Sequence, residues 1–256
     1  MNALWAVYKR ELNLLFRSTI AYAITFGLML FLGVIFSASL TQFVTDNQSG
    51  FYQPVPADPV VIGMLGTFVF LLFVVAPLLT MRLLSEEARE GTLEVLMTLP
   101  MSDWAFVIGK FLAVWTFYTF MLLLTLIHFF MIQQVGVPDV GRAFAAYIGA
   151  WLYGGAALAI AMIWSALSED QIVAAFLGAA SILVFFLADG LSLLAGQSLA
   201  AGAGDFLREL GLQTHYQQTM LQGIIRAEDI AYFVFLIAAA LFLTTLFIGT
   251  RRWRAR

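Results

Sequence analysis

Residues 82–103 read RLLSEEAREGTLEVLMTLPMSD and hold five of the sixteen acidic residues of the chain. A long apolar run ends just before this stretch at Thr80, and another begins just after it near Phe106. Because a charged, helix-forming segment between two membrane-length runs belongs in water, we expect residues 82–103 to lie at a membrane face. The stretch therefore predicts a membrane protein with a charged element between two of its spans.

The composition supports lipid as the solvent of most of this chain. Of its 256 residues 62% are hydrophobic and 11% are charged, and the mean hydropathy is +0.91. Soluble domains average about 45–50% apolar and about 25% charged residues. The absence of cysteine excludes disulfides, thiol catalysis and thiolate metal sites. A net charge of −3 argues against a nucleic-acid partner.

The expected fold is all-α, a polytopic membrane protein with six transmembrane helices in one domain, residues 1–256. Each apolar run is long enough to cross the roughly 30 Å hydrocarbon core. The predicted spans are residues 19–40, 60–80, 107–132, 143–167, 171–195 and 230–249. Residues 1–18 are expected to form an amphipathic helix at the interface, with Trp5, Tyr8 and Leu12 on its apolar stripe.

The basic residues predict the orientation. With the N-terminus in the cytoplasm, ten of the thirteen Lys and Arg residues lie inside, and only Arg142, Arg208 and Arg226 lie outside. The positive-inside rule favours this arrangement. Both termini and residues 82–103 are therefore expected in the cytoplasm, and residues 196–229 form the external segment.

Within the charged stretch, we expect one helix over residues 82–98 that Pro100 ends. Glu86, Glu90 and Glu94 form an acidic stripe at four-residue spacing, with Gly91 in mid-helix. An acidic helix gains nothing from anionic lipid, so it is better explained by a protein partner; a solvated connecting helix stays open as the alternative.

Three expectations concern residues inside the spans. Lys110, one turn inside the third span, is expected to reach the interface. The fourth and fifth spans, both rich in Gly and Ala, are expected to pack closely on each other in the interior. Asp189, an ionisable group within the fifth span, is a candidate for the substrate path, although Asp189-Gly190 could instead mark a helix break.

Two motifs carry a resemblance to a known family. The run RLLSEEAREGTLEVLMTLPMSDWAFVIGKFLA, residues 82–113, resembles permease subunits of the type-2 ABC exporters. The matching positions are Glu86, Glu87, Arg89, Gly91, Thr92, Glu94, Leu96, Pro100, Gly109 and Lys110. The later run THYQQTMLQGIIRAEDIAYFVFLIAAALFLT resembles the gliding-motility-associated branch of these permeases, through His215, Gly223, Asp229 and Tyr232.

The resemblance implies a function and a set of partners. The chain would be a permease subunit in a bacterial inner membrane, paired with a second permease chain that is identical or a paralogue. A separate ABC ATPase would hold ATP and Mg²⁺ and drive export. An external auxiliary subunit is a further partner that the resemblance leaves open. The residues implied to couple the ATPase are Arg82, Glu86, Glu87, Arg89, Glu90, Gly91, Thr92 and Glu94.

The chain itself is not expected to be an enzyme. It contains no G-x-x-x-x-G-K-[ST] sequence, so no ATP site of the P-loop type is expected. His128 and His215 form no usual metal spacing, and no metal or other cofactor is expected in this chain. A non-transporting scaffold or mechanotransmission component of an ABC-type complex, and an ATPase-independent channel or transporter, remain as alternatives.

Overall fold

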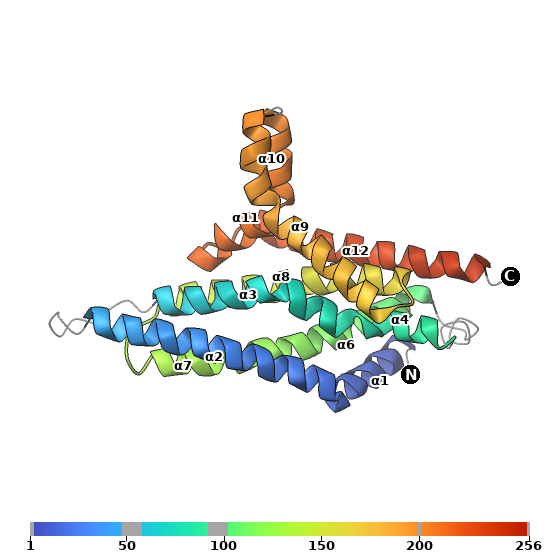
Figure 1. The fold of residues 1–256 in the computed structure, drawn as a ribbon, viewed down its shortest axis with the longest axis horizontal. Coiled ribbons are helices and arrows are strands. Elements are labelled where there is room, and N and C mark those ends of the chain that lie inside the picture. The colour runs from blue at the N-terminus through green and yellow to red at the C-terminus, as the bar shows by residue number, and fades with distance from the viewer. Residues whose placement is uncertain (1–2, 48–57, 92–101, 199–200, 255–256) are drawn as a thin grey trace.

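The structure, a computed structural model, describes residues 3–47, 58–91, 102–198 and 201–254 (Figure 1). All elements described there are helical, which confirms the all-α fold class. The principal helices are α1 (Ala3–Arg17), α2 (Thr19–Asn47), α3 (Asp58–Thr80), α4 (Arg82–Arg89), α6 (Asp103–Leu124), α7 (Leu126–Ile132), α8 (Val140–Leu167), α9 (Gln171–Ser198) and α12 (Ala227–Arg254). Between α9 and α12 lie α10 (Ala201–Leu210), α11 (Leu212–Gln217) and the 3₁₀ turn η1 (Met220–Gln222).

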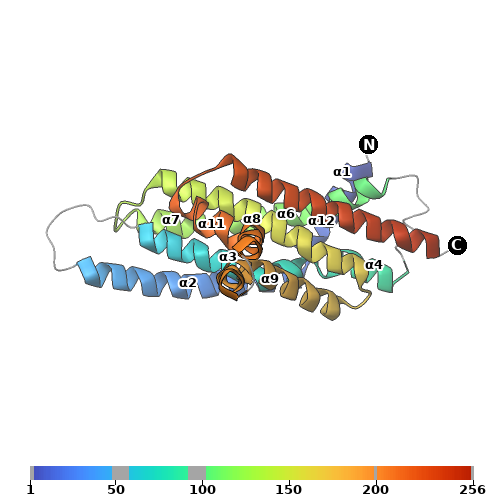
Figure 2. The ribbon, with the colours of Figure 1, turned by 90° about the horizontal axis from the view of Figure 1, so that it is seen from above.

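Within the part of the chain that the structure describes, six helices are long and apolar enough to cross a membrane. They correspond to Thr19–Thr45, Asp58–Arg89, Asp103–Ile132, Val140–Leu167, Gln171–Ala188 and Ala227–Thr250. Both termini and α4 lie at one end of the elongated bundle in both views (Figures 1 and 2). We call this the charged end, and the opposite end, where α2 ends and α3 begins, the far end (Figures 1 and 2).

Helix α8 forms the centre of the bundle. In its apolar 18-residue stretch, 78% of the residues are buried. Its glycines admit bulky aromatic side chains from other elements. A Cβ on Gly154 would fall within 2.4 Å of the Tyr118 ring of α6, and one on Gly149 would meet Tyr216 of α11 at 2.8 Å. Small residues thus permit close packing here, as they commonly do between membrane helices.

The expected pairing of the fourth and fifth spans in the interior is only half right. Helix α9 does approach α8, where a Cβ on Gly178 would lie 3.3 Å from Ala161. Only 22% of the apolar stretch Gln171–Ala188 of α9 is buried, however, so this span lies at the periphery of the single chain. After this span, the last turns of α9 pack against α10 as a helical hairpin that projects from the side of the bundle (Figure 1).

Candidate functional site: the charged end around α4

Helix α4 continues the line of α3 after a single turn residue, Met81, and is fastened to α8. The backbone N–H groups of Leu84 and Ser85 donate to Ser165 Oγ at 3.1 and 3.3 Å. Ser165 Oγ in turn donates to the Met81 carbonyl at 3.2 Å. One buried serine hydroxyl therefore fixes the start of α4 on the central helix.

The charged helix is shorter than expected. It ends at Arg89, and Gly91 adopts φ +69°, the left-handed conformation that ends many helices. A continuous helix through Gly91 is therefore wrong, because this glycine ends α4 rather than lying within it. Thr92, Glu94 and Pro100 lie outside the described residues.

A buried ion-pair cluster joins α4 to α1 and α6. Lys110 Nζ of α6 lies 3.0 Å from Glu11 Oε1 of α1 and 3.0 Å from Glu87 Oε1 of α4. Arg10 Nη1 approaches the same Glu87 oxygen at 3.5 Å. Because the Lys110 side chain is only 1% exposed, the expectation that it reaches the interface is wrong. Paired carboxylates instead compensate for its desolvation.

Gly109 explains how α1 comes close enough to place Glu11 beside Lys110. A Cβ at this position would lie 3.0 Å from the Leu4 carbonyl oxygen and 3.0 Å from Val7 of α1. The Gly109-Lys110 pair therefore combines a close helix approach with the charge that the approach allows. The side chains that α1 buries are Val7 and Glu11, whereas Trp5 of the expected apolar stripe is 51% exposed.

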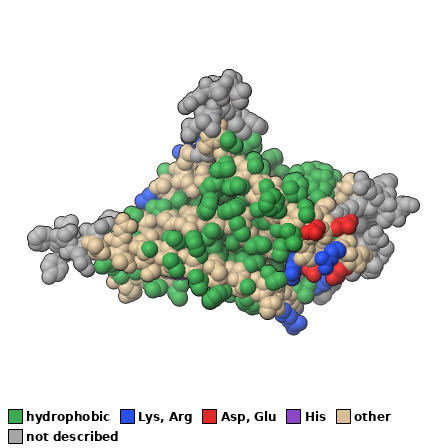
Figure 3. All heavy atoms as spheres, in the orientation of Figure 1, with side chains coloured by type: hydrophobic (Ala, Val, Ile, Leu, Met, Phe, Trp, Pro, Cys, Tyr) green, Lys and Arg blue, Asp and Glu red, His purple; other side chains and the backbone are tan. Residues whose placement is uncertain are grey.

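The other charges of this region remain accessible. Arg82, Arg89 and Glu90 are exposed, and Glu86 is half-buried. Acidic and basic side chains gather at this end of a face that is otherwise largely apolar (Figure 3). Of the expected coupling residues that the structure describes, Glu87 is the one that is held inside; the rest could meet a partner.

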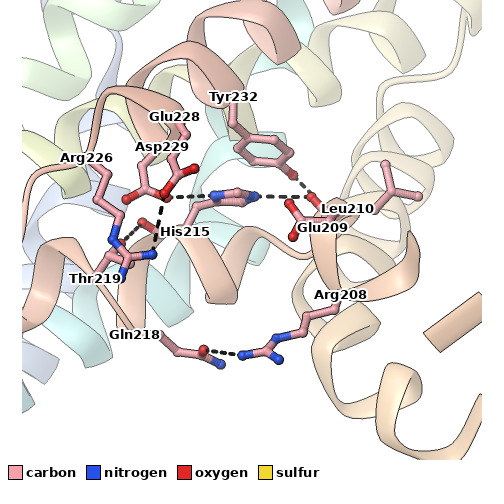
Figure 4. Close-up of polar contacts among 10 residues, drawn as sticks. All are labelled: Arg208, Glu209, Leu210, His215, Gln218, Thr219, Arg226, Glu228, Asp229 and Tyr232. Carbon is pink, nitrogen blue, oxygen red and sulfur yellow. Dashed lines mark hydrogen bonds and ion pairs between the residues drawn. The ribbon is translucent and has the colours of Figure 1, made fainter. Parts of the chain in front are cut away.

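A second polar cluster brings together three of the residues expected in or beside the external segment (Figure 4). His215 Nδ1 lies 2.8 Å from Asp229 Oδ1, and its Nε2 lies 3.1 Å from the Glu209 carbonyl oxygen. The Tyr232 ring stacks on the imidazole at 3.9 Å, and its hydroxyl donates to the Leu210 carbonyl at 2.7 Å. Both ring nitrogens thus face oxygen atoms of the chain.

Gly223, the fourth residue of that set, lies at the end of η1. It takes φ +91°, and a Cβ there would meet Arg142 of α8 at 3.1 Å. Arg142 also lies 3.7 Å from Asp58 Oδ2 at the start of α3. The glycine therefore allows η1 to lie against the starts of α8 and α3.

Tyr216 of α11 is fully enclosed beside this segment. Burial raises the pKa of its phenol well above the usual range, and Tyr147 and Tyr153 add to that shift. The hydroxyl consequently stays protonated, and the ring packs edge-on against Tyr153 at 5.8 Å between centroids.

Asp189 lies in α9, which continues as a helix through Gly190, so Asp189-Gly190 does not break the helix. Its side chain lies outside what the structure describes, and a role in a substrate path stays a prediction. Among the described residues, no three His, Asp or Glu side chains are grouped closely enough to hold a metal ion.

The six helices and the charged end define a multi-pass membrane protein. A family model described as ABC-2 family transporter protein matches residues 5–254. The chain therefore belongs to this family and is a membrane permease of the ABC transporter class, a transmembrane subunit rather than the ATPase itself. No curated protein matches the chain.

The cluster of Arg10, Glu11, Glu87 and Lys110 was not predicted from the sequence. One signal was present: Glu11 is the only acidic residue of residues 1–18, a segment that otherwise carries Lys9, Arg10 and Arg17. A lone acid in a basic amphipathic helix indicates a specific partner, and Lys110 inside a span needs one.

Proposed function

We propose that this permease is driven by a separate ABC ATPase that binds at α4, and that the complex exports its substrate. The observation that carries the proposal is the combination of an exposed charged surface with a fixed base. Arg82, Arg89 and Glu90 are accessible, whereas Leu84, Ser85 and Glu87 tie the same short helix to α8, α1 and α6.

This arrangement suits a docking element. A partner that pushes on the exposed side of α4 would act on three other helices through short, buried contacts. ATP and Mg²⁺ would bind in the ATPase, and closure of the ATPase pair would shift the spans between inward-facing and outward-facing states. The charge count supports α4 and both termini in the cytoplasm of a bacterial inner membrane.

A dimer of permease chains fits the distribution of exposed surface. In the apolar stretches of α2, α9 and α12, only 28%, 22% and 28% of the residues are buried within one chain. A second permease, identical or paralogous, would cover part of this surface, and an external auxiliary subunit would bind near residues 196–229. The likeness of residues 214–244 to the gliding-motility-associated branch supports that branch assignment; a phylogeny that groups the chain elsewhere would contradict it.

Co-purification tests the docking proposal. The double charge reversal Arg89→Glu with Glu90→Lys should abolish co-purification of the ATPase and reduce ATP hydrolysis by the complex at least about tenfold, because these side chains have few internal contacts to lose. The matched control is Arg226→Glu with Glu228→Lys, an exposed ion pair at the start of α12, away from the charged end (Figure 1). Unchanged ATPase recovery and hydrolysis in the Arg89/Glu90 variant would contradict docking at α4.

Glu87 is a poor choice for the same test, although it matches the family motif. Reversing it would place two cations against Lys110 inside the protein. Loss of activity would then report misfolding as readily as lost docking, whereas Arg89 and Glu90 separate the two.

A further inference from the structure

An open cavity of about 810 Å³ lies at the charged end, between the corner of α1 and α2 on one side and α3 and α4 on the other. Its volume falls in the range of small-molecule sites, roughly 300–1,000 Å³. Its apolar wall comes from two spans and includes Ile20, Ala21, Ile24, Leu78 and Leu79. These residues occupy the first turns of α2 and the last turns of α3, so the wall lies at the edge of the hydrocarbon layer.

Charged side chains surround the same cavity, but they are not all available to a ligand. Glu11, Glu87 and Lys110 are engaged with one another, and Arg10 adds to Glu87. Arg17 at the end of α1 is exposed, and no side-chain partner for it occurs among the described residues. Arg82 Nε donates to Gln171 Oε1 at 3.2 Å, which orients the guanidinium and leaves its terminal nitrogens free to bind.

Two acidic residues complete the mouth of the cavity. Glu86 and Glu90 line it from α4, one helical turn apart. The available groups are thus two guanidinium groups and two carboxylates above an apolar wall. This distribution matches an amphiphile with an anionic and a cationic group on one head and an apolar tail.

We propose that this cavity binds an aminophospholipid of the adjoining leaflet. Arg17 and Arg82 bind the phosphate, since guanidinium groups form strong charge-assisted hydrogen bonds to phosphate oxygens. The primary ammonium meets Glu86 and Glu90, and one acyl chain lies along Ile20, Ile24 and Leu79. Basic pockets between membrane helices commonly bind lipid head groups, and the paired carboxylates here add a preference for an ammonium.

The position of the cavity beside two membrane spans favours a lipid, rather than a segment of a protein partner, as its occupant. The apolar part of the wall belongs to α2 and α3, and Ile20 is 36% exposed beside it, so the cavity is continuous with surface that faces hydrocarbon. Arg82 and Glu90 line the cavity and also belong to the proposed ATPase-docking surface, whereas Arg17 of α1 lines the cavity alone. A variant at Arg17 therefore tests the lipid site separately from docking.

Lipid titration followed by native mass spectrometry of the purified full-length chain tests the proposal. Dioleoylphosphatidylethanolamine should bind about tenfold more tightly than dioleoylphosphatidylglycerol, which lacks the ammonium. The variant Arg17→Glu should weaken phosphatidylethanolamine binding about tenfold. The matched control Lys9→Glu reverses an exposed charge on the same helix, outside the cavity, and should bind as the original chain does.

A second variant separates the two halves of the head group. Glu86→Gln should reduce the preference for phosphatidylethanolamine over phosphatidylglycerol while leaving phosphatidylglycerol binding unchanged or stronger. Equal affinities of the two lipids for the original chain would overturn the ammonium assignment, and equal binding by Arg17→Glu and Lys9→Glu would overturn the site. Retention of the ATPase by Arg17→Glu would show that this outcome is independent of docking.

Discussion

The two polar clusters of this permease differ in what they connect. The cluster at the charged end joins Glu11, Glu87 and Lys110, which are up to 99 residues apart in sequence and lie on three helices. The cluster around His215 and Asp229 contains contacts between residues at most 22 apart in sequence and holds a short segment onto the start of α12. The first connects three helices that are distant in sequence, whereas the second shapes one local region. This comparison yields three predictions.

The largest effect is expected from Lys110→Met. It would remove the buried cation that Glu11 and Glu87 share and leave them only the half-exposed Arg10, and breaking a buried ion pair in this way costs about 3–5 kcal/mol. We expect a large fall in the thermal stability of the detergent-solubilised chain, measured by the fluorescence of its tryptophans. The triple variant Glu11→Gln, Glu87→Gln, Lys110→Met removes the uncompensated charge and should recover most of the loss. A stable Lys110→Met protein would contradict the ion-pair cluster.

A smaller and local effect is expected at the other cluster. Asp229→Ala removes the acceptor of His215 Nδ1, and leaving a buried donor unsatisfied costs about 1–3 kcal/mol. Hydrogen exchange should accelerate in residues 209–222 and stay unchanged in α4. Glu228→Ala is the control, because that neighbouring side chain is 70% exposed. Equal acceleration at both ends would mean that the two clusters are not independent.

The smallest effects compare the two left-handed glycines. At both Gly91 and Gly223 an alanine would adopt an unfavourable conformation that costs roughly 1–2 kcal/mol. Among the described residues, a Cβ at Gly91 would have no neighbour within 4 Å, but one at Gly223 would also press on Arg142 at 3.1 Å. Gly223→Ala should therefore lower the thermal midpoint more than Gly91→Ala. The reverse order would indicate that residues after Gly91 pack against it.

The spans could be predicted because hydropathy responds to lipid directly. A run such as residues 60–80 has few alternatives to a membrane helix, since unsatisfied backbone groups are excluded from hydrocarbon. The end of α4 was also readable in principle, because Arg89 in the last turn followed by Gly91 is a common helix-termination signal. The repeated acidic spacing of Glu86, Glu90 and Glu94 favoured a longer helix and outweighed it.

The charged site could not be predicted to the same depth. Lys110 and Glu87 each look like surface charges at the end of a span, and only the approach of α1 over Gly109 shows that both are inside. Contacts across 99 residues leave no periodic trace in a single sequence. His215, Asp229 and Tyr232 were found through resemblance, and the structure adds the geometry that connects them.

The attachment of α4 to Ser165 also has a mechanical consequence. Eight helical residues make a lever about 12 Å long. The backbone at the start of α4 donates hydrogen bonds to the Ser165 hydroxyl of α8, the central helix of the bundle. A force applied near Arg89 would therefore act directly on the central helix α8, through Ser165, rather than on a peripheral helix.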